Sequence, residues 1–118
     1  MAEIYQIGSG MIGQAMALDL AENHKIHLAD LKIENVRKEI KDHPAIITYY
    51  LDVLNEQKLS SFIQKADIVL LAVPGYLGYN ALETIISSGK NVVDISFSPE
   101  NIMKLNDIAI QNLSLIHI

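Results

Sequence analysis

The stretch Ile7-Gly8-Ser9-Gly10-Met11-Ile12-Gly13 decides the fold of this chain. It follows an apolar run at 3–7 and begins a segment of helical periodicity, and a second apolar run ends at Asp30. Strand, tight turn, helix, second strand and terminal carboxylate form the context that the G-x-G-x-x-G fingerprint of dinucleotide-binding sites requires. A glycine turn without a ligand is the alternative, and this context disfavours it. We therefore expect a phosphate-binding turn at 8–13.

The three glycines of this turn have different expected roles. Gly8 lets the chain turn sharply at positive φ, and Gly10 lets a pyrophosphate approach the unpaired amides at the start of the helix. Ser9, Met11 and Ile12 complete the turn. The third glycine belongs to one helical stripe, expected to press against the sheet, which consists of Gly13, Met16, Ala17, Leu20 and Ala21.

Composition limits the class of protein. The chain has 118 residues, of which 50% are hydrophobic, enough for one domain over 1–118 with a filled core. No apolar run reaches the ~20 residues of a membrane span, and Met1-Ala2-Glu3 leads into a strand rather than a signal peptide. A net charge of −5 disfavours nucleic-acid binding, which needs clustered basic residues. The absence of cysteine excludes disulfides and agrees with a cytoplasmic enzyme.

Strand and helix patterns alternate along the chain. This alternation predicts a three-layer α/β fold, a Rossmann-type doubly wound parallel sheet with strand order 3-2-1-4-5-6. The predicted strands cover 3–7, 25–29, 45–50, 67–73, 91–95 and 113–118. The predicted helices cover 10–23, 34–41, 55–65 and 77–88, and a further helix begins at Ser98-Pro99-Glu100.

Asp30 ends the second predicted strand, 17 residues after Gly13. A carboxylate at this place accepts hydrogen bonds from the adenosine ribose hydroxyls and repels a 2′-phosphate, which favours NAD over NADP. A surface loop aspartate is the alternative interpretation. Lys32 could partly neutralise a phosphate, so NADP is the less favoured cofactor rather than an excluded one.

Further candidate residues follow strand ends on the crevice side. Asp52 and Val53 follow the third strand, where Asp52 would accept from the adenine amine and Val53 would cover the ring. Asp52 as the N-cap of the next helix is equally supported. The segment Ala72-Val73-Pro74 ends the fourth strand where strand order reverses, and it is expected to line the nicotinamide-side ribose. Ser96, after the fifth strand with Asp94, is a candidate for the nicotinamide end.

Other residues give no sign of a second site. The histidines lack metal-ligand spacing and are expected to be solvated or structural; they are His24, His27, His43 and His117. Met11 and Met16 are expected to fill the core. Neither G-x-S-x-G nor G-x-x-x-x-G-K-[ST] occurs, so a serine nucleophile elbow and a nucleotide-hydrolysing P-loop are not expected.

Several segments together resemble the N-terminal NAD(P)-binding domain of the saccharopine dehydrogenase and L-lysine 6-dehydrogenase family. The matching segments are 8–14, 28–30, 51–53, 66–69, 72–75 and 91–97, and Val93-Asp94-Ile95-Ser96-Phe97 with Pro99-Glu100 is the most specific of them. The resemblance implies an oxidoreductase that acts on a carbon–nitrogen bond of an amino acid or polyamine precursor by hydride transfer. It also implies a second, substrate-binding domain and a homodimer in the full-length protein.

The end of the sequence departs from the family pattern, which continues with an Asp-x-Gly segment and a Pro-Gly turn. Leu113-Ser114-Leu115-Ile116-His117-Ile118 resembles translated sequencing-adapter sequence. On this interpretation the chain is truncated at the sixth strand and its last six residues are not native. The catalytic and substrate-binding residues would then be missing, and the chain alone is expected to be inactive.

A regulatory nucleotide-sensing module of the potassium-channel-gating type is the alternative function. Such modules share the glycine fingerprint and the acid after the second strand. They usually carry a Gly-Asp-Ala-Thr-like turn after the third strand and a Thr-rich segment after the fourth. This chain has Leu51-Asp52-Val53 and Val73-Pro74-Gly75 at those places, which favours the oxidoreductase.

Overall fold

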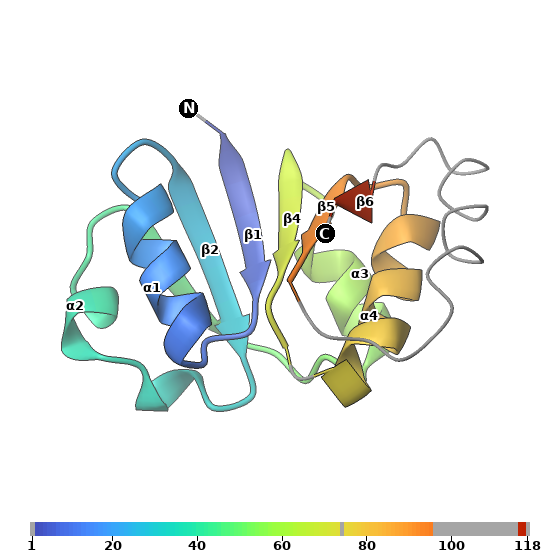
Figure 1. Ribbon diagram of the computed structural model, residues 1–118, viewed down its shortest axis with the longest axis horizontal. Helices are drawn as coiled ribbons and strands as arrows, with labels where there is room; N and C mark the ends of the chain where they lie inside the picture. The colour runs from blue at the N-terminus through green and yellow to red at the C-terminus, as the bar shows by residue number, and fades with distance from the viewer. Residues whose placement is uncertain (1, 74, 96–115, 118) are drawn as a thin grey trace.

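The computed structural model describes residues 2–73, 75–95 and 116–117. Its strands pair in parallel in the order β3-β2-β1-β4-β5-β6, which confirms the predicted topology (Figure 1). The strands are β1 (Glu3–Ile7), β2 (Lys25–Asp30), β3 (Ile46–Tyr50), β4 (Ile68–Leu71), β5 (Val92–Asp94) and β6 (Ile116–His117). The helices are α1 (Met11–Leu20), η1 (Ile33–Asn35), α2 (Lys38–Lys41), α3 (Glu56–Phe62) and α4 (Gly75–Ser87).

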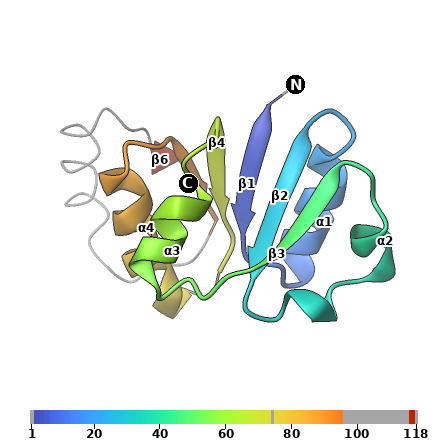
Figure 2. The same ribbon diagram turned by 180° about the vertical axis from the view of Figure 1, so that it is seen from behind.

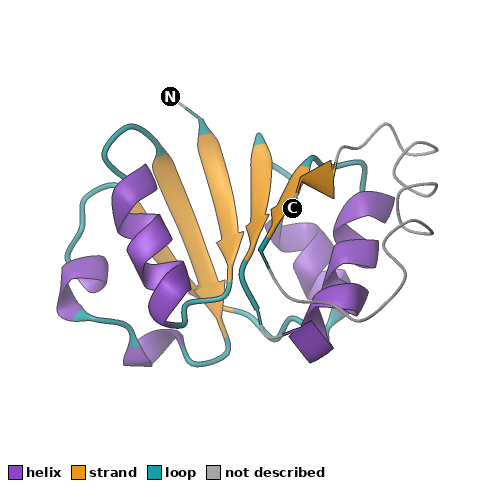
Figure 3. Ribbon diagram, viewed as in Figure 1, coloured by secondary structure: helices purple, strands orange, loops and turns teal. Residues whose placement is uncertain are grey.

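Helices cover both faces of the sheet, so that the strands form one layer between them (Figures 2 and 3). One core lies under α1 and α2 and includes Ile4 and Ile40. The other lies under α3 and α4 and includes Ile7, Leu59 and Ile85. Successive side chains of a strand point to opposite faces, which is why Ile4 and Ile7 belong to different cores. The central strand β4 contributes to both, as its apolar run predicts.

The segment predicted as one helix at 34–41 is instead two short helical pieces, η1 and α2. Between them Val36 and Arg37 have extended backbone, with ψ of 157° and 153°. Val36 and Ile40, the apolar residues of an otherwise exposed segment, are both buried against the core under α1. The Arg37 amide, which a continuous helix would pair with the Ile33 carbonyl, donates instead to Gln14 Oε1 of α1 at 3.0 Å. A contact with α1 therefore replaces the helical hydrogen bond at this break.

Helix ends differ by a few residues from the predictions. α1 ends at Leu20 rather than 23, with Ala21 as its C-cap. Asn55 is the N-cap of α3, and its side chain accepts a hydrogen bond from the Lys58 amide at 3.1 Å. Gly89, just after α4, has φ of +76°, the left-handed conformation in which many helices end. The predicted helix at 98–100 and most of the predicted strand at 113–118 lie outside the described residues.

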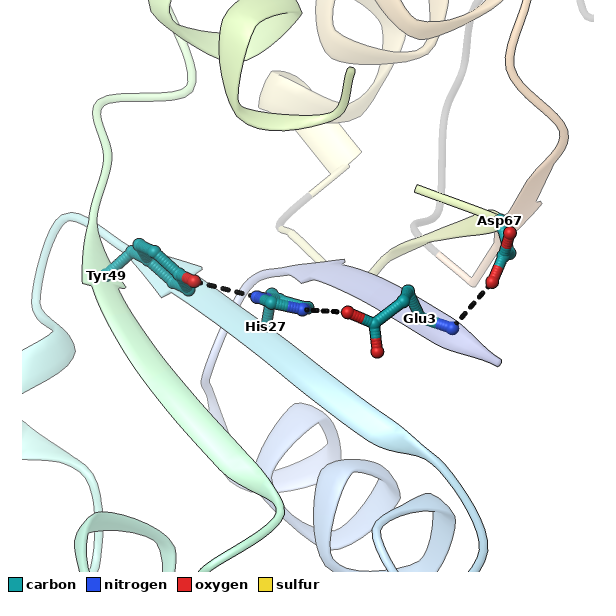
Figure 4. Close-up of polar contacts among 4 residues, drawn as sticks. All are labelled: Glu3, His27, Tyr49 and Asp67. Carbon is teal, nitrogen blue, oxygen red and sulfur yellow. Dashed lines mark hydrogen bonds and ion pairs between the residues drawn. The ribbon is translucent and has the colours of Figure 1, made fainter. Parts of the chain in front are cut away.

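His27 has a structural role on the sheet face under α3. Its ring stacks on Tyr5, with centroids 4.0 Å apart, and its two nitrogens contact Tyr49 Oη at 2.7 Å and Glu3 Oε1 at 3.2 Å (Figure 4). Since a carboxylate only accepts, Nε2 donates to Glu3; in the neutral tautomer that this requires, Nδ1 accepts the Tyr49 hydroxyl proton. Burial raises the pKa of Tyr5 and of Tyr49, which keeps both hydroxyls protonated.

The other described histidine rings also contact the protein's own backbone. His24 Nδ1 accepts from the Ala2 amide at 3.0 Å, and His43 Nδ1 accepts from the Ala45 amide at 3.0 Å. No group of histidine and acidic side chains in the described part of the chain is arranged to hold a metal ion. None of the helices in that part is long and apolar enough to cross a membrane.

Candidate functional site

A cavity of about 130 Å³ lies where β1, β2, β3 and β4 end. Its walls are mostly apolar, and two carboxylates, those of Asp30 and Asp52, stand among them. In Figure 1 the ends of β1 and β2 lie at the lower edge of the sheet, beside the first turn of α1. The lining residues are Ile7, Gly8, Ala29, Asp30, Leu31, Leu51, Asp52, Val53, Leu54, Val73 and Leu77. The cavity thus brings together five of the residues predicted from sequence, which come from four segments of the chain.

Gly8 and Gly10 differ in what surrounds them. Gly8 has φ of +106°, and its amide donates to the Ala29 carbonyl at 2.9 Å. A Cβ there would collide with the Ala72 carbonyl, so the turn also needs glycine because the end of β4 passes so close. At Gly10, by contrast, no protein atom lies within 4 Å of where a Cβ would stand. The absence of a side chain at Gly10 leaves space that the described protein does not fill.

The start of α1 offers unpaired amides. Gly10 is the N-cap residue and has no side-chain cap. Its carbonyl accepts from the Gln14 amide at 2.9 Å, but the amides of Gly10, Met11 and Ile12 have no hydrogen-bond acceptor among the described residues. The N–H groups at the start of any helix lack intrahelical acceptors, and together with the helix dipole they attract anions. These amides therefore fit a phosphate group.

A close contact inside the turn requires glycine at position 13. A Cβ there would stand 2.6 Å from the Gly8 carbonyl oxygen and 3.1 Å from Gln6 Nε2. The predicted stripe does face the sheet, since Ala17 and Ala21 are buried and Met16 and Leu20 pack against the same core. The tightest contact of Gly13, however, is with the carbonyl of the first glycine rather than with a strand side chain.

Asp30 is held in place by two backbone amides. Its Oδ2 accepts from Ser9 N at 2.7 Å and its Oδ1 accepts from Lys32 N at 2.9 Å. The first bond ties the end of β2 to the glycine turn, so the carboxylate is not a free surface group. Each oxygen keeps a further lone pair, and a fixed carboxylate at the cavity rim can accept from a ligand hydroxyl.

Asp52 does not cap α3, which is one of its two predicted roles. The cap is Asn55, as described above, and Asp52 Oδ1 instead accepts from the Leu54 amide at 3.0 Å. This short turn orders the loop that follows β3 and sets Asp52 and Val53 beside the cavity. Sequence alone could not separate the two roles because both aspartate and asparagine are good caps.

The remaining predicted residues have varied positions. Ser9 is buried, and Ala72 donates its amide to the Ile7 carbonyl at 2.8 Å, which fixes the end of β4 beside β1. Met11 is 89% exposed at the start of α1, so its prediction as core filling is wrong. Met11 lies outside the stripe of α1 residues that packs on the sheet. Pro74 and Ser96 lie outside the described residues.

Two glutamines were not predicted to take part. Gln6 is fully buried within β1, and its Nε2 donates to the carbonyls of Gly8 and Gly13. Gln14 donates from Nε2 to the Ser9 carbonyl at 2.8 Å. The signal available in the sequence was a polar residue inside the apolar run before the glycines.

Comparison with known proteins now gives the family. A family model, the saccharopine dehydrogenase NADP binding domain, matches residues 4–114. The chain belongs to this family. It is an NAD(P)-binding domain of the saccharopine dehydrogenase-like oxidoreductases, as the sequence resemblance predicts. Among curated proteins, none matches the chain.

Solved structures share the fold of this saccharopine dehydrogenase-family domain. Apo saccharopine dehydrogenase (L-Glu forming) from Saccharomyces cerevisiae matches with a TM-score of 0.84 and 19% identity, over 98% of this chain and 26% of the yeast chain. Scyllo-inositol dehydrogenase from Lactobacillus casei, with bound NAD(H) and scyllo-inositol, matches with a TM-score of 0.73 and 16% identity, over 98% and 36% of the two chains. A short-chain dehydrogenase/reductase from Veillonella parvula matches with a TM-score of 0.69 and 17% identity, over 98% and 68%. The chain thus spans about a quarter of the length of the yeast enzyme.

Proposed function

We propose that this domain binds NAD(H) in preference to NADP(H) and serves as the cofactor-binding part of an oxidoreductase that acts on a carbon–nitrogen bond. When bound, the nicotinamide would supply or accept the hydride. The amides of Gly10, Met11 and Ile12 would hold the pyrophosphate, Asp30 the adenosine ribose, and Asp52 with Val53 the adenine. Ala72, Val73, Pro74 and Ser96 complete the set as candidates for the nicotinamide side.

The observation that carries the cofactor preference is the fixed carboxylate of Asp30. Two backbone amides hold it at the cavity rim, so it cannot swing away from a 2′-phosphate. Among the described residues that line the cavity, none is basic. Two cationic residues close to the turn in the hydrogen-bond network, Lys32 and Arg37, are exposed. Lys32 donates its backbone amide to Asp30, and Arg37 Nε donates to Gln14 Oε1 at 3.3 Å. A 2′-phosphate would therefore meet negative charge without a cation at the cavity wall, although the family description names NADP.

The substrate side of the proposal comes from the family. The family resemblance also implies a second, substrate-binding domain and a homodimer in the full-length protein, and both belong to the same proposal.

Isothermal titration of the domain with NAD⁺ and with NADP⁺, under the same buffer and salt, tests the preference. NAD⁺ is expected to bind at least fivefold more tightly. Equal affinities, or tighter binding of NADP⁺, would overturn the proposal. NADH and NADPH, titrated in the same way, check that the difference follows the 2′-phosphate rather than the redox state.

A further inference from the structure

We propose that Gln6 and Gln14 are positioning residues of the phosphate-binding turn. They bind the carbonyls of Gly8 and Ser9, two successive peptide units, from two different elements. The inference rests on dinucleotide binding by the domain, but not on which dinucleotide is preferred, because NAD and NADP share the pyrophosphate.

Gln6 holds the turn from within the sheet. Its Nε2 donates to Gly8 O at 3.1 Å and to Gly13 O at 2.6 Å, so that one amide joins the first glycine to the first turn of α1. Its Oε1 is buried and has no partner among the described residues. A buried acceptor without a partner destabilises a fold, so stability alone would favour an apolar side chain at this position of β1. What Gln6 contributes is the fixed orientation of the two glycine carbonyls.

Gln14 holds the same turn from the helix. Its Nε2 donates to Ser9 O at 2.8 Å, and its Oε1 accepts from Arg37 N at 3.0 Å and from Arg37 Nε at 3.3 Å. Both ends of the amide are thereby used, and the side chain connects the turn to the segment between η1 and α2. Arg37 in turn restrains Gln14, because it donates to the same oxygen twice.

Together these contacts leave a defined set of groups for an anion. The Gly8 amide donates to the Ala29 carbonyl, and the Ser9 amide donates to Asp30 Oδ2. The side chains of the two glutamines donate to the carbonyls of Gly8 and Ser9. The amides of Gly10, Met11 and Ile12 are left without an acceptor among the described residues. A carbonyl that turned toward the pyrophosphate would repel it, so restraint of both carbonyls prepares the turn before the cofactor arrives.

The test compares Gln6→Met and Gln14→Met, which keep side-chain length and remove the hydrogen bonds. Gln57→Met is the matched control, because Gln57 is exposed on α3, across the sheet from the turn. Each variant is titrated with ADP-ribose and with adenosine, which lacks the pyrophosphate, by following amide chemical shifts. We expect each site variant to bind ADP-ribose at least fivefold more weakly and adenosine within twofold of the unchanged domain, and Gln57→Met to match the unchanged domain for both.

Equal losses for ADP-ribose and adenosine would show a merely structural role and overturn the proposal, as would unchanged affinity for ADP-ribose. Gln14→Met keeps the test decisive if Gln6→Met does not fold, since Gln14 lies outside the core clusters. A preference for NADP⁺ in the unchanged domain would refute the proposed cofactor choice and leave this comparison intact.

Discussion

The carboxylate of Asp30 accepts a 2.7 Å hydrogen bond from the backbone amide of Ser9. This contact joins the end of β2 to the glycine turn after β1, two segments that are adjacent in the sheet and 21 residues apart in sequence. It places a fixed negative charge beside the amides that begin α1. The proposed preference for NAD(H) rests on this arrangement.

Asp30→Asn is expected to weaken NAD⁺ binding about tenfold or more, because hydrogen bonds to a charged group contribute ~1.5–3 kcal/mol. NADP⁺ binding should weaken less or improve, so that the ratio of the two affinities narrows. Calorimetric titration of both cofactors measures the ratio. Asp19→Asn, the same change of charge on an exposed part of α1, should leave it unchanged. An unaltered ratio of NAD⁺ to NADP⁺ affinity in Asp30→Asn would show that Asp30 does not contact the ribose.

Gly13→Val should destabilise the domain. Its Cβ would stand 2.6 Å from the Gly8 carbonyl, and overpacking of this kind costs about 1–3 kcal/mol. Urea unfolding gives the free energy of unfolding. Ala15→Val is the control, because Ala15 is exposed on the same helix. The free energy of unfolding should fall much less in this variant. If Gly13→Val were as stable as Ala15→Val, this result would contradict the close approach of Gly13 to the Gly8 carbonyl.

Gly10→Val should give the opposite result, loss of cofactor binding with little loss of stability. The φ of Gly10 is −69° and its ψ is −172°, which valine adopts without strain. Beyond its chain neighbours, no atom of the described residues lies within 4 Å of the new Cβ. The side chain would instead fill the space in front of the free amides. Urea unfolding checks that the free energy of unfolding is little changed, and titration with NAD⁺ measures the loss of binding. Retained affinity for NAD⁺ would mean that the ligand does not approach Gly10.

Stability should fall as the pH rises above 10. Tyr5 and Tyr49 have a pKa raised from 10.0 by burial, so the unfolded chain loses these phenolic protons at a lower pH than the folded one. Their stabilising contribution is complete below pH 10 and is lost as the pH rises through the folded pKa.

Urea midpoints measured from pH 8 to pH 11 should decline less steeply for Tyr49→Phe than for the unchanged domain. Tyr49→Phe also loses the hydrogen bond to His27, so the slopes with pH, and not the absolute midpoints, are compared. Tyr50→Phe, on an exposed residue of the same strand, is the control and should keep the original slope. Equal slopes for all three proteins would contradict the effect of burial on Tyr49.

The sheet order and the glycine turn could be predicted because each depends on local backbone requirements. Gly8 has the predicted positive φ, and open space lies where a Cβ of Gly10 would stand. The close contact of Gly13 is with the Gly8 carbonyl rather than with a strand. The alternation of strands and helices then leaves few topologies, and the observed order is the one expected for this class.

Contacts between distant segments could not be predicted. Nothing near Gln6 in the sequence indicates that its amide reaches the carbonyl of Gly13, because that contact exists only once α1 packs on β1. The break in the predicted helix at 34–41, where the Arg37 amide donates to Gln14 Oε1, also depends on a tertiary contact. The prediction of Met11 as core filling failed because Met11 lies outside the stripe of α1 residues that packs on the sheet.

Amide chemical shifts of the isotope-labelled domain, followed as NAD⁺ is added, test the central claim most directly. The account predicts saturable shifts for Gly10, Met11, Ile12, Asp30 and Val53, and little change for Ser60, Glu83 and Thr84 in the groove between α3 and α4. Shifts confined to that groove, or no saturable shift at the start of α1, would contradict it.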